Sequence, residues 1–350
     1  MARSSAIGQD SGAMPSIVAH LFHRDAGSAL RRACRPTVKA EGRDVNESDF
    51  DAQGSRCPNC GSRRMTQFQA TASDSASPDI VNITECDSCG FAWQYPLARS
   101  SEQSVQYFEA AYLDAGRSQS DYFDPDNKRQ IAELELEFVE SLVPAKGTIL
   151  DIGAGAGIFA EVAARHGWLA TALDPALEIT NPRPNGPVRF IKGTTSDVPE
   201  GTTFDVVTMW DVIEHVTNPL ETLKAATRLV ASDGWLILET GNYRSADRVQ
   251  GGLDYWIYQL DHRWYFSPDS LANVLRSVGY ANIVFAKRAH RPNWNGSPQY
   301  PGPSPRALLK EILRRPFQTK GHVTKYLKLM EARQWAMSGI PIFTVAAKRA

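Results

Sequence analysis

The segment that most constrains the fold of this chain is residues 148–175, TILDIGAGAGIFAEVAARHGWLATALDP. An apolar run containing Asp151 leads into three glycines, an amphipathic stretch closed by Gly167, and a second apolar run that ends in Asp174. This order predicts a strand, a tight glycine loop, a helix and a parallel strand, because buried strands read as short apolar runs and glycine closes helices. Such a unit binds a nucleotide-like ligand at the glycine loop.

The spacing of the glycines distinguishes two classes of ligand. A dinucleotide loop has the pattern G-x-G-x-x-G, whose third glycine lets helix and strand pack closely. Here Gly153, Gly155 and Gly157 give G-x-G-x-G, and the bulky Ile158 occupies the place of the third dinucleotide glycine. The preceding acid, Asp151, suits an ammonium group better than a pyrophosphate. The loop therefore favours S-adenosylmethionine (SAM) over a dinucleotide.

Strands and helices alternate through the rest of the chain. Apolar runs predict further strands at 188–193, 204–210, 235–240, 282–287 and 340–349. Asn218 followed by Pro219, and Ser267 followed by Pro268, predict the starts of two helices, because these residues suit the N-cap and the first helical position. This alternation predicts an α/β fold with a doubly wound, mostly parallel sheet, whose ligand lies beyond the carboxyl ends of the strands.

Composition limits what surrounds this domain. The 350 residues are 42% hydrophobic with a net charge of −1, so no overall charge attracts nucleic acid or a membrane surface. We expect four regions along the chain. They are a leader or disordered segment at 1–54, a cysteine module at 55–95, a helical connector at 96–145 and the α/β domain at 146–350. An insertion at 290–338 turns basic from Arg306 to Lys328, which suggests either a solvated helical hairpin or contact with a membrane or lipid-linked substrate. Without a recognisable secretion signal, we expect a cytoplasmic protein.

Four of the five cysteines form two C-x-x-C pairs, and they are Cys57, Cys60, Cys86 and Cys89. A glycine follows each pair and permits the tight turn of a metal-binding knuckle. Four thiolates select a tetrahedral zinc ion, which is structural because no coordination position stays open. The intervening alternation predicts a hairpin, so the region reads as a zinc ribbon. Its charges are mixed, which favours a docking or lid module over a nucleic-acid reader.

The segment around the glycine loop resembles motif I of the class I SAM-dependent methyltransferases, and so do two later stretches, FDVVTMWDVIEHVTNP and DHRWYFSPDSLANVLRSVGY. The resemblance implies a seven-stranded sheet whose last strand is antiparallel and lies beside the sixth. It implies that Asp151 and the Gly153–Gly157 loop hold the methionine part of SAM and that Asp174 holds the ribose. Trp210 and Asp211 should border the cofactor. The adenine contact stays open between the threonines at 194–195 and Asp197.

Catalytic candidates come from two further resemblances. DHRWYFS is similar to a stretch of bacterial sugar C-methyltransferases that also carry an N-terminal zinc module, which implies His262 as the base and Asp261 as its neighbour. The alternative is that His262 only braces its loop. Asp211, Glu214 and His215 resemble the acid-x-x-Glu-His stretch of ubiquinone-pathway O-methyltransferases, which implies His215 as a second candidate and, as a further option, a divalent metal site.

Together these features predict a SAM-dependent methyltransferase that acts on a small molecule, with a sugar or polysaccharide precursor favoured and O- or C-methylation open. Two alternatives remain: a methyltransferase of nucleic acid or protein that uses the zinc ribbon as reader, and a binding module that has lost its chemistry. Aromatic residues between Tyr243 and Trp264 suit either stacking on a ring of the acceptor or packing in the core.

Overall fold

The computed structural model describes residues 56–73, 79–98, 124–176, 186–286, 305–314 and 342–349, together with single positions between these ranges. The expected leader segment, Cys34 and most of the 290–338 insertion lie outside the described residues. The domain boundaries expected from the sequence stay predictions.

A seven-stranded sheet forms the centre of the α/β domain. Its strands, in spatial order, are β10 (Asn282–Phe285), β11 (Ile342–Lys348), β8 (Val230–Gly241), β7 (Phe204–Trp210), β4 (Thr148–Ile152), β5 (Leu169–Asp174) and β6 (Arg189–Lys192). The strands from β8 to β6 are parallel, and β11 runs antiparallel between β8 and β10. The mostly parallel doubly wound sheet and the place of the last strand are thereby confirmed.

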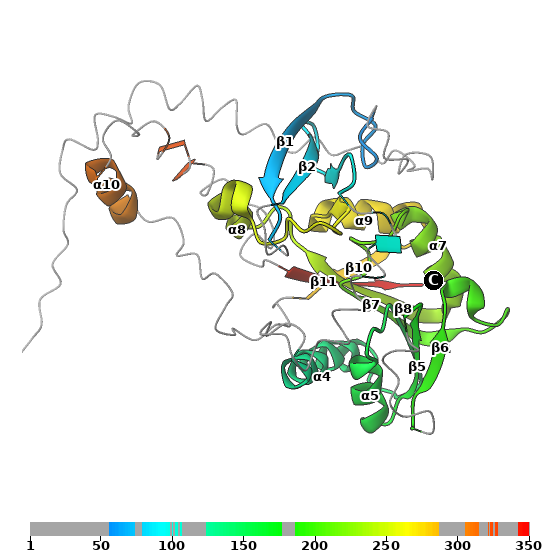
Figure 1. The fold of residues 1–350 in the computed structure, drawn as a ribbon. Helices are drawn as coiled ribbons and strands as arrows, with labels where there is room; N and C mark the ends of the chain where they lie inside the picture. The colour runs from blue at the N-terminus through cyan, green and yellow to red at the C-terminus, as the bar shows by residue number, and fades with distance from the viewer. Residues whose placement is uncertain are drawn as a thin grey trace, which may run out of the picture. The chain divides into compact units, whose positions relative to one another are not determined.

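Helices cover both faces of this sheet. The helices α4 (Pro125–Leu142) and α5 (Ile158–Arg165) lie on one face, and α7 (Pro219–Leu229) and α9 (Pro268–Ser277) lie on the other (Figure 1). Neighbouring residues of β7 serve opposite faces: Val206 packs in the cluster with α4 and α5, whereas Val207 packs in the cluster with α7 and α9. Both are fully buried, as expected for a parallel strand covered on both sides.

A second, smaller sheet contains the hairpin of the cysteine module. Its antiparallel strands are β1 (Met65–Thr71), β2 (Ile80–Cys86), β3 (Ala92–Gln94) and β9 (Trp264–Tyr265). The hairpin of β1 and β2 was expected from the sequence. The fourth strand was not, because β9 lies about 170 residues further along the chain, after β8.

The remaining described elements are short. They are the 3₁₀ turns η2 (Thr195–Asp197) and η3 (Gly252–Asp254) and the helices α8 (Ala246–Gly251) and α10 (Pro305–Arg314). Within the described part of the chain, no helix is both long and apolar enough to cross a membrane.

Candidate functional site

The carboxyl ends of β4 and β7 meet where the connections of the sheet reverse direction. From β4 the chain continues to β5 and β6 on one side, and from β7 it continues to β8 on the other. Ligands of doubly wound sheets bind outside the strand ends at this point. Asp151, Asp174 and Asp211 lie at or beside the ends of β4, β5 and β7. The structure therefore brings these three predicted residues to one edge.

The glycine loop has the tight geometry that its sequence predicts. Gly153, Gly155 and Gly157 all have positive φ angles, of 73°, 51° and 76°. A Cβ atom on Gly157 would lie 2.6 Å from Cε1 of Phe190, which is closer than side chains tolerate. The strand, turn and helix of motif I are confirmed, whereas the role of these glycines in holding a cofactor stays a prediction.

With respect to the described residues, Asp174 keeps acceptor capacity where the ribose is expected. Its Oδ2 accepts from the N–H of Gly155 (2.9 Å), and its Oδ1 accepts from the N–H of Ala176 (2.8 Å). These bonds fix the carboxylate, and each oxygen keeps a second lone pair. Partial burial raises the pKa of Asp174. A rigid carboxylate with two open lone pairs fits a ligand that offers two adjacent hydroxyl groups.

Asp151 is a buried carboxylate that a cationic ligand would stabilise. It is 3% exposed and accepts a hydrogen bond from the Thr208 hydroxyl (2.9 Å). Burial raises the pKa of Asp151 to about 7, and the nearby charge of Asp174 adds to this effect. An ammonium group beside Asp151 would favour the ionised carboxylate and offset the free energy that burial of its charge costs. Sequence reasoning did not single out Thr208, although a threonine within the apolar run of β7 is a signal of a buried polar partner.

The end of β7 presents Trp210 and Asp211 at the same edge. Trp210 packs against Phe159 of α5, with ring centroids 5.1 Å apart, and its buried Nε1–H has no hydrogen-bond partner within the described residues. Asp211 has a φ of 53°, which turns the chain sharply as it leaves the strand. Their contact with the cofactor stays a prediction.

The turn after β6 gives Asp197 a local task. Its Oδ2 accepts from the N–H of Thr194 (2.7 Å) and closes a capping box at the start of η2. The carboxylate is therefore turned back on its own backbone. The adenine contact remains open between this residue and its threonine neighbours.

The two candidate histidines, which are 47 residues apart in sequence, lie side by side. Their ring centroids are 4.6 Å apart in an edge-to-face arrangement. Nδ1 of His262 lies 2.8 Å from the carbonyl oxygen of Ile257. Because a carbonyl only accepts, Nδ1 carries the proton in the neutral ring and Nε2 keeps a lone pair. Nδ1 of His215 lies 3.4 Å from Oδ2 of Asp261.

These neighbours separate the protonation states of the two rings. Burial and the positive charge of His215 lower the pKa of His262 to about 4. Burial also disfavours a charged His215, but Asp261 outweighs it and raises the pKa of His215 to about 9. Burial likewise opposes the carboxylate of Asp261, and His215 in turn holds the pKa of Asp261 below its usual range. At neutral pH the pair thus contains one neutral ring with a lone pair and one protonated ring.

Glu214 completes this cluster and offers a second kind of chemistry. It is 3% exposed, its Oε2 has no hydrogen-bond partner among the described residues, and burial raises its pKa to about 7. Atoms of Glu214, His215 and His262 lie within 4.8 Å of one another, so together they could hold a divalent cation. This set contains His262 where the motif resemblance suggested Asp211.

The aromatic run mostly belongs to the core. Tyr243, Tyr255, Tyr258 and Trp264 are at most 2% exposed, and only Trp256 of the five is half-buried. The first three pack together with Tyr265 under the hairpin of β1 and β2. Of the two interpretations of this run, the structure supports core packing.

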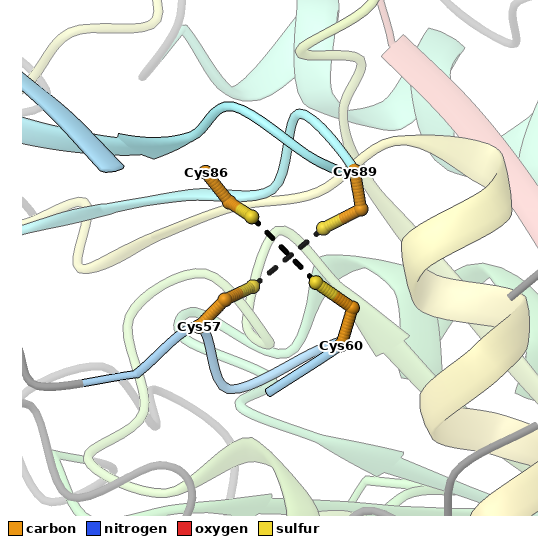
Figure 2. Close-up of side chains that lie close together, drawn as sticks. All are labelled: Cys57, Cys60, Cys86 and Cys89. Carbon is orange, nitrogen blue, oxygen red and sulfur yellow. Dashed lines mark hydrogen bonds between the residues drawn. The ribbon is translucent and has the colours of Figure 1, made fainter. Parts of the chain in front are cut away.

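The four cysteines of the module converge on one point (Figure 2). The sulfur atoms of Cys57 and Cys89 are 3.6 Å apart, and so are those of Cys60 and Cys86. These distances are too long for disulfides, whose sulfurs are about 2 Å apart. A tetrahedral ion with Zn–S bonds of about 2.3 Å separates its sulfurs by about 3.8 Å. The residues therefore fit a tetrahedral metal ion such as zinc.

The backbone around the cysteines forms the two expected knuckles. Gly61 and Gly90 both have a φ of 71°, and their N–H groups donate to the carbonyls of Cys57 and Cys86 (2.8 Å each). The side chain of Asn59 donates to the sulfur of Cys89 (3.5 Å), a bond that favours a thiolate. The chain thus folds each pair in the conformation that a shared metal requires.

The order of the seven-stranded sheet and the glycine loop define an α/β fold of the nucleotide-binding type, whose loop lacks the dinucleotide spacing. A family model described as "Methyltransferase domain" matches residues 123–284. This range includes every predicted SAM-binding residue and both candidate histidines. The chain belongs to the SAM-dependent methyltransferases.

Two relatives and one solved structure show what the chain is similar to. A ubiquinone biosynthesis O-methyltransferase of Paracidovorax citrulli is 31% identical over 168 residues, which are 43% of this chain and 70% of that protein. The enzyme of the same name from Albidiferax ferrireducens is also 31% identical, over 43% of this chain and 66% of its own length. The solved 1,6-didemethyltoxoflavin-N1-methyltransferase of Burkholderia thailandensis, which holds S-adenosylhomocysteine, covers 80% of this chain and 99% of its own, at 15% identity and a TM-score of 0.46.

Proposed function

We propose that the chain methylates a hydroxyl group of a small molecule, with His262 as the base that takes up the hydroxyl proton. The observation that carries this proposal is the hydrogen bond from Nδ1 of His262 to the carbonyl of Ile257, which leaves Nε2 as a lone-pair acceptor. The O-methyltransferase names of the relatives support transfer to oxygen. The sugar or polysaccharide precursor stays a finer prediction, supported by the DHRWYFS stretch and the cysteine module.

SAM, when bound, supplies a methyl group on a sulfonium, so the protein must bind, align and deprotonate the acceptor. We propose that Asp151 and the loop of Gly153, Gly155 and Gly157 bind the methionine part and that Asp174 binds the ribose. In this proposal His215, held by Asp261, donates a hydrogen bond to the acceptor beside His262. Glu214 adds a buried acceptor atom to the same cluster.

Calorimetric titration with SAM tests the cofactor assignment. Asp174→Ala should bind SAM about 10- to 100-fold more weakly than the wild type, because it loses the charged acceptor for the ribose hydroxyls. Asp126→Ala, on the exposed start of α4, is the matched control and should bind normally. Equal binding by Asp174→Ala and wild type, or binding by neither, would refute the assignment.

The formation of S-adenosylhomocysteine tests the acceptor class. The probes are catechol for a phenolic hydroxyl and UDP-glucose for a sugar hydroxyl, with RNA and a mixed protein substrate as competing classes. Turnover of UDP-glucose alone would support the sugar prediction, and turnover of catechol alone would place the acceptor among phenols. Turnover confined to RNA or protein would refute the small-molecule proposal and favour the zinc ribbon as reader.

The role of His262 has its own test. With an accepted probe, His262→Gln should lower the rate of methyl transfer by about 10²–10⁴-fold, the usual contribution of a positioned base. Its affinity for SAM should stay within about twofold of the wild type. His166→Gln removes a half-exposed histidine paired with Glu133 and is the control. A His262→Gln enzyme with wild-type turnover would reduce this residue to a brace of its loop.

We also propose that Cys57, Cys60, Cys86 and Cys89 bind one structural zinc ion. The convergence of their sulfur atoms and the two knuckle turns support it.

The prediction of contact with a membrane or lipid-linked substrate through 306–328 rests on helix α10, in which Leu309 and Leu313 are 54% and 74% exposed, one turn apart. The same exposure is compatible with a solvated helix.

A further inference from the structure

The segment that contains His262 is held on one side by the cysteine module. Strand β9 begins two residues after this histidine and pairs with β3, with Ala92 opposite Tyr265 and Trp93 opposite Trp264. β3 itself begins two residues after the second knuckle. The backbone that leaves the metal-binding turn therefore continues directly into the strand that fixes the histidine segment.

One buried side chain of β3 clamps this segment. Gln94 is 1% exposed, and its Nε2 donates to the carbonyls of Gln259 (3.2 Å) and His262 (3.3 Å). Its Oε1 accepts from the N–H of Ala98 (2.6 Å), so the amide orientation is settled by three bonds. The backbone N–H of Gln94 donates to the carbonyl of Arg263 (2.9 Å). One residue thus engages three backbone carbonyls across the histidine.

The opposite side of the segment is held by the loop that carries the other histidine. The N–H groups of Arg263 and Trp264 donate to the carbonyl of Glu214 (2.8 and 3.2 Å). The histidine segment is therefore sandwiched between β3 and the loop after β7. Displacement of β3 would change the separation of the two rings, which is 4.6 Å in this structure.

An aromatic cluster joins the knuckles to the same strand pair. Phe91, which lies between the second knuckle and β3, packs against Trp93, Trp264 and Phe266 with ring centroids 5.5 to 6.3 Å apart. The cluster shares its core with Cys57 and Cys86. Displacement of the cysteines would therefore be transmitted to β9 through close packing.

We propose that the cysteine module is a positioning device for the acid–base site and that Gln94 is its positioning residue. The module would then act on the chemistry through backbone geometry without touching substrate. This proposal rests on the role of His262 given above. This role differs from recognition of the substrate by the module and from stabilisation of the fold alone.

The test reads the geometry of His262 without cofactor or acceptor. In protein labelled with ¹⁵N-histidine, the Nδ1–H of His262 should give a protected signal, assigned by its loss in His262→Gln. Gln94→Glu keeps the size of the side chain and the acceptor for Ala98 but replaces the donor of the clamp. We expect this variant to lose the signal and to exchange the amides of residues 257–265 at least about tenfold faster.

Gln69→Ala is the matched control, because Gln69 lies in the same small sheet and bonds Asn82 at an exposed position on β1 and β2. It should leave the His262 signal unchanged. SAM titration checks that each variant is folded. If Gln94→Glu does not fold, Gln94→Met is used in its place. An unchanged His262 signal in a folded Gln94 variant would overturn the proposal.

A second arm uses the wild-type chain, so the proposal stays testable if neither variant folds. Stripping the metal with a chelator should accelerate exchange in residues 257–265 before exchange in β4 and β5 changes. Equal acceleration in all strands, or none in 257–265, would overturn the proposal. If the untreated wild-type chain does not bind SAM, the proposed function is refuted instead. The two failures are therefore distinguishable.

Discussion

At the scale of single residues, the sheet edge at the carboxyl ends of β4, β5 and β7 carries a carboxylate that the folded chain does not stabilise well. Asp151 is 3% exposed and receives its described hydrogen bond from a neutral hydroxyl. Burial raises its pKa from 3.8 to about 7. Such a cost is typical of binding sites, where the missing stabilisation comes from the ligand.

The pH dependence of stability should reveal this cost. An acid whose pKa is raised in the folded chain binds more protons there than in the unfolded chain. The free energy of unfolding therefore falls as the pH rises from about 4 to about 7, and it stays low above pH 7. Asp151→Asn keeps an oxygen for Thr208 and removes the charge. It should be more stable than the wild type at pH 8, by at most about 4 kcal/mol, and similar at pH 4.

Urea unfolding at the two pH values, without SAM, measures this difference. Asp205→Asn is unsuitable as a control because Asp205 bonds Thr148, whereas Asp126→Asn removes an exposed charge of the same kind. A stability gain that is equal at pH 4 and pH 8 would show that charge burial is not its cause. Asp151→Asn should also bind SAM more weakly, which would mark a trade of stability for binding.

At the scale of elements, the helices start where local chemistry directs. The side-chain oxygen of Asn218 accepts from the N–H groups of Leu220 and Glu221 (3.1 and 3.2 Å) and caps α7, and Pro219 takes its first position. Ser267 caps α9 in the same way. Both starts were expected from the sequence and are confirmed, because a cap depends on neighbours within three residues.

Substitution of the α7 cap should separate two causes of helix stability. Asn218→Ala should lower the free energy of unfolding by about 1 kcal/mol, because two helix N–H groups lose their acceptor. Asn218→Gly should cost only a few tenths of a kcal/mol, since water reaches the exposed groups and glycine adopts the cap conformation. Thermal or urea unfolding measures both values. Equal losses for alanine and glycine would mean that packing of Asn218, rather than capping, holds the helix start.

At the scale of the whole molecule, the cysteine module and the methyltransferase domain share one sheet. β9 belongs to the polypeptide after β8 yet forms the fourth strand beside β3. Further bonds cross between the parts: Asn273 of α9 donates to Asn59 between the first two cysteines (2.9 Å), and Arg244 donates to the carbonyl of Cys89 (3.3 Å). These contacts integrate the described part of the module with the domain.

Calorimetry of metal-loaded and metal-depleted protein tests this integration. Elemental analysis should find one zinc per chain, and its removal should lower the midpoint of a single unfolding transition. Cys86→Ser should act in the same direction, because it removes one ligand of the buried site. Cys34→Ser, the change of a cysteine outside the two pairs, is the control. A separate low-temperature transition for the module would contradict shared folding, and clearly more than one metal would point to Glu214, His215 and His262 as a second site.

The sequence by itself determined whatever depends on near neighbours. The glycine loop, the helix caps, the hairpin of β1 and β2 and the two cysteine knuckles all follow from residues within a few positions of one another. The order of the sheet was also predictable, through the resemblance of three separated motifs. These features need little information about distant contacts.

Tertiary structure alone decided which distant residues meet. The sequence contains His215 and His262 as separate candidates, and only the fold places their rings 4.6 Å apart. It likewise pairs β3 with β9 and places Gln94 across the histidine segment. A two-residue strand carries almost no periodic signal, and a clamp through backbone carbonyls leaves no pattern in side-chain types. Such contacts arise from packing of the whole molecule, which is why the link between the cysteine module and the proposed base could not be predicted.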